Sequence, residues 1–358
     1  MRLREILREA GRDLASGTAR AVLLAVGVAA VAVTCTVADL RAMGAVVDAV
    51  VTFRSVGASI RIVEVPQGID ARVCDGLTHL PGVRAAGALR KVKEPLTLGV
   101  LPSNPLTLYE ASPAFATMLP ASTGQSRTGL LVPTGLARTL GVGIGQQVPT
   151  SQGTALVGGT YSYPEDGRPP GMGWAAIALV PADHGFDECW MDAHPVAAST
   201  AAALLWAISA DLPVPDADVV TRQHNSTLGL PTVPARDFLA RPTARLPLVA
   251  FAVALVLAGA ATWMRRLELA SALHVGVRRL DQMACLAMQT LVWAGVGAAP
   301  AVPVALALTR GRAAETAQVL ALHACMNPLM GVAGALVGTL VAAALVRERR
   351  IFTWFKSR

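Results

Sequence analysis

Charged residues are scarce in this chain, and lysine is the scarcest of them. Only 15% of the 358 residues are charged, and the lysines are Lys91, Lys93 and Lys356. A nucleotide-binding P-loop needs a lysine directly after a glycine-rich loop, and none of these lysines stands in that context. The chain therefore does not bind and split ATP by that route.

Metal-binding and catalytic motifs are also missing. The one cluster of metal-ligand residue types runs from Asp183 to His194, and its spacing matches neither HExxH nor CxxC. A polar turn followed by a strand is the better interpretation. We expect no metal site, no catalytic residue and no cofactor of its own in this chain.

Ionisable residues are absent from the middle of the long apolar runs. Proton- and ion-driven transporters normally keep one there. The nearest polar pair is Gln289 and Thr290, for which hydrogen bonding between helices is the better interpretation. Energy for any transport must therefore arrive from elsewhere.

Apolar sequence is what the chain has in abundance. Its mean hydropathy of +0.49 is too high for a soluble domain of this length. Several runs reach or approach the ~20 residues that a helix needs to cross ~30 Å of hydrocarbon. The predicted fold is α-helical and membrane-embedded, with four spans at 21–44, 246–264, 283–309 and 326–346.

Arginines gather beside these spans in segments 1–20, 265–282 and 347–358, whereas segment 310–325 holds only Arg310 and Arg312. The positive-inside rule places both termini and the basic segment 265–282 in the cytoplasm. Segments 45–245 and 310–325 then lie outside. Because the net charge of +7 follows the membrane topology, we expect a lipid bilayer and no nucleic acid as a partner.

The first 20 residues predict an amphipathic helix along the inner membrane surface. Its apolar face is made of Leu3, Ile6, Leu7, Ala10 and Leu14. A cleaved signal peptide is the alternative, since Thr36-Val37-Ala38 resembles a cleavage site. We favour the helix, because the stretch before the first span is too long and too acidic for a signal peptide.

Segment 45–245 is long enough to form its own core and predicts an extracytoplasmic α+β domain. It holds two strand-helix-strand units, at 58–65, 69–80 and 83–92 and at 188–191, 195–212 and 217–221. Two such units predict a ferredoxin-like lobe. A β-rich lobe at 104–184 is inserted between them, with strands at 106–110, 129–132, 155–161 and 174–180 and a helix at 134–140.

The five cysteines divide between the spans and the 45–245 domain. Cys35, Cys285 and Cys325 lie in or beside spans, where a thiol is usually a small apolar filler. Cys74 and Cys189 both fall in the 45–245 domain, which we place in an oxidising compartment. The sequence leaves two alternatives for this pair, one disulfide or two unpaired thiols.

The third and fourth spans carry helix-shaping residues. Pro300 and Pro303 predict a kink in the third span. Gly331, Gly334 and Gly338 form a small-residue face on the fourth, suited to close helix packing. We favour packing within the chain over a dimer contact for these glycines.

The basic segment reads RRLELASALHVGVRRL from Arg265 to Leu280. It resembles the cytoplasmic signature of the MacB-type, FtsX-like permease family, whose members usually read RRREIALLRALGASRR here. Further pieces are similar to that family's periplasmic core domain and occur in its order, at 80–84, 109–113, 131–141 and 157–160. The resemblance thus covers the whole chain.

The resemblance implies a permease that pairs with a second permease, identical or different. Two copies of a separate ABC ATPase subunit would bind ATP and Mg²⁺ and move the spans, and mechanotransmission would carry that motion to the outer domain. Carried over by position, the ATPase-coupling residues are Arg265, Arg266, Glu268, Leu269, Gly276, Arg278 and Arg279. Segment 271–273, Arg278 and Gln289 depart from the family pattern, which bears on which ATPase docks.

A bacterial cell-membrane protein is the resulting expectation. Within the family, we expect export or extraction of a peptide, lipid-linked or hydrophobic client, because an outer domain of about 200 residues is larger than regulatory members usually carry. An FtsX-like regulator of an envelope enzyme is one alternative. A membrane-tethered receptor or scaffold without an ATPase is the other.

Overall fold

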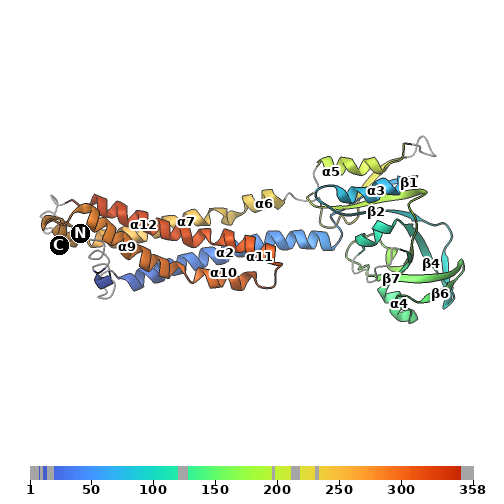
Figure 1. Cartoon of the computed structure of the whole chain (residues 1–358), viewed down its shortest axis with the longest axis horizontal. Coiled ribbons are helices and arrows are strands. Elements are labelled where there is room, and N and C mark those ends of the chain that lie inside the picture. The colour runs from blue at the N-terminus through green and yellow to red at the C-terminus, as the bar shows by residue number, and fades with distance from the viewer. Residues whose placement is uncertain are drawn as a thin grey trace. The chain divides into compact units, whose positions relative to one another are not determined.

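The computed structural model describes residues 8, 11–13, 20–119, 128–195, 198–210, 218–229 and 234–347. They form two compact units (Figure 1). The helical unit combines Met1–Val47 with Ala235–Arg358, and the β-rich unit is Asp48–Pro234. The predicted amphipathic helix 1–20 and the tail 347–358 lie almost wholly outside the described residues.

Four helical segments are long and apolar enough to cross a membrane, as predicted. They are Ala21–Ser55, Pro242–Met264, Arg279–Thr309 and Ala314–Leu345. The helices are α2 (Ala21–Ser55), α6 (Pro234–Ala240), α7 (Leu246–Met264), α8 (Arg266–His274), α9 (Arg279–Ala298), α10 (Ala301–Thr309), α11 (Ala314–Ala324) and α12 (Met326–Leu345).

Helical structure extends into three segments that were predicted to lie outside the spans. Helix α2 does not end at residue 44 but continues to Ser55, because no proline interrupts it. Half of the predicted loop 265–282 is helix α8, and its last residues belong to α9. Most of the predicted loop 310–325 is helix α11, which begins with Glu315 in its first turn and buries Leu320.

The third span is interrupted at the prolines for which a kink was predicted. Helix α9 ends at Ala298 and α10 starts at Ala301, with Pro300 and Pro303 at the break. A proline inside a helix removes a backbone donor and clashes with the preceding turn. The third candidate span is therefore divided into two helices.

Helices α7 and α12 pack with their backbones in contact. A side chain at Gly334 would overlap the carbonyl of Phe251, and one at Gly338 would overlap that of Leu255. At Gly331 an added Cβ would meet no atom within 4 Å. The predicted intrachain packing therefore holds for Gly334 and Gly338, whereas Gly331 takes no part in it.

The strands of the β-rich unit form one sheet in the order β10-β1-β9-β2-β4-β3-β6-β7-β5-β8. They are β1 (Ile60–Asp70), β2 (Val83–Lys91), β3 (Leu96–Leu98), β4 (Leu101–Ala111), β5 (Gly129–Pro133), β6 (Gln147–Thr150), β7 (Gly153–Tyr161), β8 (Ala175–Leu179), β9 (Gly185–Ala193) and β10 (Val220–Gln223). The strands β10, β1, β9 and β2 are antiparallel neighbours. A further pairing of β4 with β8 closes β3 to β8 into a barrel.

Side chains of β1, β9 and β2 alternate between two cores, as the pleat of a strand requires. Val63 and Met191 point to helices α3 (Ala71–Gly76) and α5 (Ala198–Ala203) and the helical turn Leu204–Ala207. Figure 1 shows α3 and α5 on one side of these strands. Ile62 and Trp190 face the opposite core with Phe115 and Tyr161, so the barrel covers the second face.

Gly87 permits the contact between the barrel side of the unit and β2. A Cβ on Gly87 of β2 would lie 2.5 Å from the Cα of Phe115. Only a residue without a side chain lets the helical turn Pro113–Met118 approach β2 this closely. A third core fills the barrel, where Leu136 of α4 (Thr134–Leu140) packs on Leu106 and Leu130.

Sequence patterns located most elements of this unit but not all. Helix α4 has the predicted bounds, whereas the predicted helix 195–212 is reduced to α5 and the turn after it. Sequence patterns do not predict strands β3 and β6, because β3 has three residues and β6 has four residues that include a proline. Since β3 belongs to the barrel, the β-rich lobe begins before residue 104.

Candidate functional site

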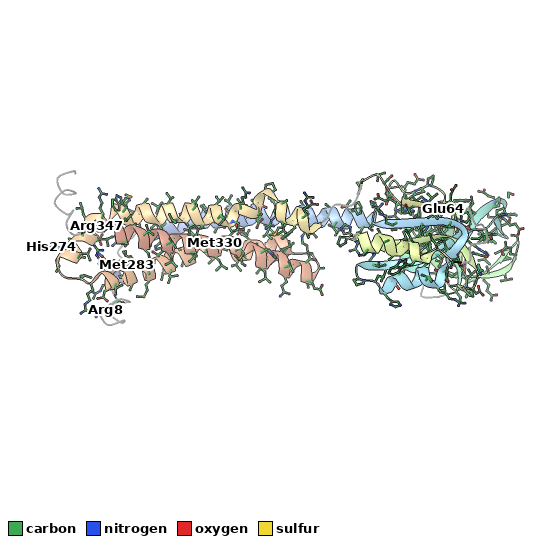
Figure 2. All side chains as sticks on the ribbon, turned by 90° about the horizontal axis from the view of Figure 1, so that it is seen from above. Arg8, Glu64, His274, Met283, Met330 and Arg347 are labelled. Carbon is green, nitrogen blue, oxygen red and sulfur yellow. A yellow bond between two sulfur atoms is a disulfide. The ribbon has the colours of Figure 1, made fainter. Side chains whose placement is uncertain are left out.

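The predicted coupling residues lie at the corner between α7 and α9. Arg265 follows α7, α8 runs to His274, and a turn at Val275–Arg278 leads into α9. Figure 2 shows Arg8, His274, Met283 and Arg347 at the same end of the helices. The corner is therefore the end of the helical unit where the first and last described segments meet.

Arg265 is the centre of a polar network at this corner. Its Nη2 and Nε donate to the two carboxylate oxygens of Glu268 at 2.6 and 3.0 Å. Its Nη2 is also 3.5 Å from Oδ2 of Asp13, and Nε2 of Gln289 donates to that same oxygen at 2.8 Å. The contact of Arg265 with Glu268 is therefore bidentate, a geometry that strengthens a charged hydrogen bond. The contacts of Arg265 and Gln289 with Asp13 join the start of α8 and α9 to the N-terminal segment.

The buried side of α8 anchors it to two other helices. Leu269 and Ala270 pack on Leu286 of α9 and Ala343 of α12. Nε2 of Gln282 donates to the Leu269 carbonyl at 2.9 Å. Nη2 of Arg279 donates to the carbonyl of Val346 at 3.2 Å. Helix α8 is thus fixed to the start of α9 and to the residue after α12.

The turn after α8 presents side chains to the surroundings. Gly276 has φ +96°, a conformation that favours glycine, and it reverses the chain there. Val275 and Leu280 on its two sides are 85% and 80% exposed, and Arg278 between them is exposed too. Arg266 lies over the ring of Trp263 at 5.9 Å. An anchored helix with an exposed apolar and basic turn can bind a groove on a partner.

The sequence predicted a set of coupling residues but not the contacts that hold them in place. Asp13 was one acid among several in the first 20 residues, and Gln289 was assigned to contacts between spans. Thr290 does make such a contact, with its hydroxyl 3.1 Å from that of Thr339 on α12.

A buried ion pair lies at the other end of the helical unit. Nε of Arg241 is 2.9 Å from Oδ1 of Asp39, whose side chain is 1% exposed. Arg241 also donates to the Phe238 carbonyl at 2.6 Å and lies over the Phe238 ring. Asp39 lies near the end of the predicted span 21–44, and Arg241 directly precedes the candidate span Pro242–Met264, so the pair does not contradict the expectation that no span holds a central ionisable residue. The two residues are distant in sequence, and pairing makes the burial of Asp39 tolerable.

Helix α2 ends inside the β-rich unit, where two distant side chains hold its last carbonyls. Arg168 donates to the carbonyls of Ser55 and Val56 at 2.5 and 3.2 Å. Nδ2 of Asn225 donates to the Val56 carbonyl at 2.9 Å. His224 beside them is buried against Trp190, and burial, with the charges of Arg168 and Arg222, lowers its pKa to about 3. The helix end is therefore bonded into the fold of this unit.

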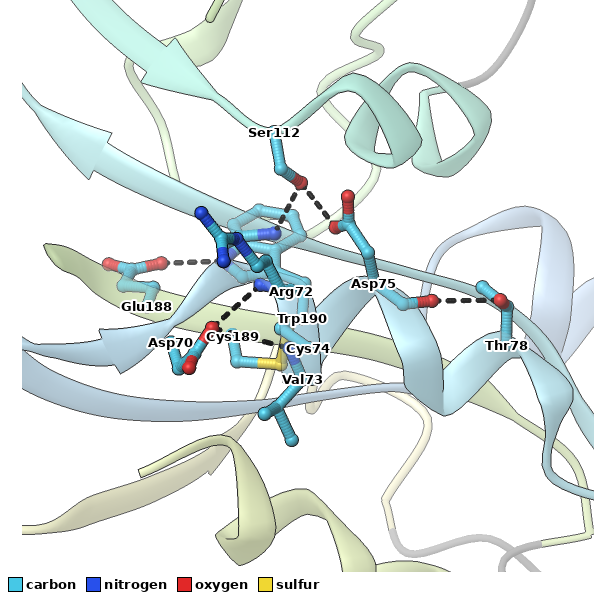
Figure 3. Close-up of a disulfide and its surroundings, with 11 residues drawn as sticks. Asp70, Arg72, Val73, Cys74, Asp75, Thr78, Ser112, Glu188, Cys189 and Trp190 are labelled. Atoms are coloured by element: carbon cyan, nitrogen blue, oxygen red, sulfur yellow. Dashed lines mark hydrogen bonds between the residues drawn. A yellow bond between two sulfur atoms is a disulfide. The ribbon is translucent and has the colours of Figure 1, made fainter. Parts of the chain in front are cut away.

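Cys74 and Cys189 form a disulfide between α3 and β9, with their Cα atoms 5.9 Å apart (Figure 3). Of the two alternatives open from the sequence, the structure shows the bonded one. Oδ1 of Asp70 accepts from the backbone of Arg72 and caps α3. Asp75 accepts from the Ser112 hydroxyl at 2.5 Å, and its burial raises its pKa. These contacts fix α3 on the sheet.

Asp183, His184, Glu188 and Asp192 of segment 183–194 each bond a different partner and do not converge on one site. Asp192 accepts from Ser59 and Arg84, and Glu188 accepts from Trp190 and Arg222. His184 bonds Asp183 at 2.7 Å. Within the described residues, no group of three or more such side chains could hold a metal ion.

A polar pocket of about 600 Å³ adjoins His184. Its charged lining residues are Arg72, Arg90, Asp70 and Asp183. Arg90 is further paired with Glu110, and Asp70 is used in capping α3. Because its positive and negative groups balance, this pocket indicates no particular charge in a ligand.

The fold and these sites define a membrane protein with four candidate spans and a large β-rich domain that contains a barrel. No family model matches the sequence, and no curated protein matches it. Among solved structures, the chain matches the periplasmic region of MacB from Actinobacillus actinomycetemcomitans. That match has 10% identity and a TM-score of 0.32, and covers 42% of this chain and 82% of the other. So weak a likeness establishes no shared fold.

Proposed function

We propose that this chain is the permease subunit of an ABC-type system of the MacB-like kind. A separate ATPase subunit would hydrolyse ATP, and the helical unit would convey the motion to the β-rich unit. The β-rich unit would act outside the cytoplasm of a bacterial cell, on a peptide, lipid-linked or hydrophobic client. Two permease chains and two ATPase subunits would make the complex.

The observation that carries this proposal is the form of segment 265–280. One side is fixed by the contacts of Arg265, Leu269 and Gln282, and the other exposes Val275 and Leu280. A force applied to the exposed turn would reach α9 and α12 through these contacts. The sequence has no P-loop of its own, so the force would come from a partner.

Two further features support the direction of transmission. Helix α2 continues without a break from the helical unit to the groups that hold its end, Arg168 and Asn225. The disulfide of the β-rich unit is of the kind that persists in an oxidising compartment. With arginines flanking the opposite ends of the spans, this favours termini and α8 in the cytoplasm.

The interleaved order β10-β1-β9-β2, with helices on one face, supports a ferredoxin-like lobe as part of the proposal. Such a lobe joined to a barrel offers a large surface for a client. A receptor or scaffold without an ATPase would leave the exposed turn without a function.

The decisive experiment is reconstitution with an ATPase. The full chain would be co-expressed with each stand-alone ABC ATPase subunit of its source genome, and ATP hydrolysis measured in nanodiscs. We expect Val275→Asp with Leu280→Asp to lower the stimulated hydrolysis at least about tenfold, because charge replaces apolar docking groups. Leu239→Asp, at a 74% exposed leucine of α6, is the matched control and should have no effect.

A second measurement tests the sidedness separately. A cysteine introduced at Val275, with Cys285 and Cys325 replaced by serine, should react with a membrane-impermeant thiol reagent only after cells are opened. Labelling on intact cells, or ATP hydrolysis that no variant of the turn alters, would contradict the proposal.

A further inference from the structure

A pocket of about 520 Å³ lies against the last turns of α2 in the β-rich unit. The side chains that give it charge are Arg54, Arg84 and Arg168. Its apolar wall is made of Val51, Ile60, Met118 and Leu119. Among the described residues no acidic side chain lines it, in contrast to the balanced pocket at Arg72 and Asp183.

The three arginines differ in how far their charges are compensated. Arg84 donates to Asp192 at 2.6 Å, and Arg168 is 3.1 Å from Asp166. Arg54 has no ion pair within the part of the chain that the structure describes, and its Nε is buried without a hydrogen-bond partner there. A buried donor that bonds neither protein nor water is costly, and each such group calls for an explanation.

A second unsatisfied group lies beside Arg54. Both ring nitrogens of His194 are buried without a hydrogen-bond partner among the described residues, and the ring packs on Phe53 at 5.6 Å. Burial, followed by the charge of Arg54, lowers the pKa of His194. At neutral pH this part of the unit therefore has an uncompensated guanidinium next to a neutral ring, and an anion would satisfy the guanidinium.

We propose that this pocket binds the oxyanion head group of an amphiphile, with the apolar chain of the ligand against Val51, Met118 and Leu119. A guanidinium suits a phosphate or carboxylate, which accepts its planar donors in pairs. The exposed Val51 and the buried Met118 and Leu119 offer apolar surface next to it. An uncharged or cationic ligand would leave Arg54 without a partner.

The place of this pocket links it to α2. Arg168 lines the pocket and also holds the carbonyls of Ser55 and Val56. An occupant would thus touch a group that fixes the end of the helix. The identification of this ligand as the transported client rests on the proposed function. The binding of the ligand can be measured without any ATPase.

The test is calorimetry on the full chain in nanodiscs of zwitterionic lipid. The probes are hexyl phosphate, inorganic phosphate and hexylammonium. We expect hexyl phosphate to bind at least about tenfold more tightly than inorganic phosphate, because its chain buries apolar area. Hexylammonium should not bind. Equal affinity for the two phosphates, or binding of the cation, would overturn the proposal.

Variants locate the binding. Arg54→Gln should weaken hexyl phosphate binding at least about tenfold, as loss of a charged hydrogen bond does. Arg72→Gln, in the other pocket, should bind like the parent. In case Arg54→Gln disturbs the helix end, Thr117→Glu adds a negative charge at an exposed wall position, and Thr117→Gln is its neutral control.

Unchanged affinity in both Arg54→Gln and Thr117→Glu would overturn this assignment. It would leave ATPase stimulation through the α8 turn untouched, so the two proposals fail separately.

Discussion

In the helical unit small residues let two helices approach closely, whereas the cores of the β-rich unit are filled by large side chains. Gly334 and Gly338 admit the carbonyls of α7, and the buried residues of α7 are alanines and a threonine. In the β-rich unit the largest fully buried side chains are Tyr161, Phe115 and Phe186. In lipid no water drives apolar groups together, so helices gain by close approach. In water, burial of large apolar side chains contributes most.

The two units also differ in the bonds that join distant segments of the chain. The helical unit holds Asp39 and Arg241 in a largely buried pair at the end away from α8, and the more open Arg265 network beside α8. The β-rich unit also pairs a buried carboxylate, that of Asp192, with Arg84, and it adds a covalent bond between Cys74 and Cys189. The stability of each unit should therefore respond to different changes.

The largest expected effect is loss of the disulfide. Cys74→Ala with Cys189→Ala should lower the free energy of unfolding of the β-rich unit by about 4 kcal/mol, because the bond closes a long loop, with 115 residues of separation. Pulse proteolysis of the full chain in urea, with fragments assigned to each unit, measures this. Cys285→Ala is the control. Equal resistance of both variants would show that the units do not differ in this way.

The next effect concerns the buried ion pair. Asp39→Asn should destabilise the helical unit by about 3 kcal/mol, because the charge of Arg241 is left buried and unpaired. Arg41→Gln, at an exposed position of the same helix, should change little. Unfolding in a denaturing detergent series measures both.

A double variant sharpens that test. Asp39→Leu with Arg241→Met removes both charges and should recover most of the lost stability, since paired charges can be replaced by apolar groups at little cost. If the double variant is as unstable as Asp39→Asn, the pair is not the cause.

A smaller effect is expected at the α7–α12 contact. Gly338→Val should cost about 2 kcal/mol, because the side chain must push the Leu255 carbonyl away. Gly331→Val, where an added Cβ meets nothing within 4 Å, is the matched control. The same detergent series measures the difference, and identical midpoints for the two variants would argue against backbone contact as the stabilising feature.

The smallest effect is a pH dependence confined to the β-rich unit. His224 is buried, with its pKa lowered from 6.5 to about 3, so its neutral form stabilises the fold. This stability is complete above pH 6.5 and is lost as the pH falls toward 3. We expect a loss of about 1 kcal/mol between pH 6.5 and 5.5.

Pulse proteolysis across this pH range should show the loss in the parent chain and in His79→Gln, but not in His224→Gln. A slope that survives in His224→Gln would assign it to another group.

Sequence patterns were most informative where the signal is local. Hydropathy located four segments long enough to span, and alternation located β1, β2 and β9. They failed at boundaries that depend on tertiary contacts. Helix α2 continues to Ser55, where Arg168 and Asn225 bond the carbonyls at its end. Part of segment 265–282 folds as α8, because Leu269 and Ala270 pack on α9 and α12.

The candidate site divides in the same way. The residues from Arg265 to Arg279 could be selected from the sequence because they resemble a family signature. Asp13 and Gln289 could not, since their contacts with Arg265 join positions far apart in the chain. The burial of Asp39 and the unsatisfied Nε of Arg54 likewise depend on which segments meet around them.

The amino-acid order alone thus determined the number of spans, the two-unit plan and the lack of a P-loop, because these follow from the composition and spacing of neighbouring residues. The tertiary structure alone decided the pairing of Cys74 with Cys189, the barrel closed by β4 and β8, and the partners of each buried charge. Those features depend on the meeting of distant segments, which no local pattern records.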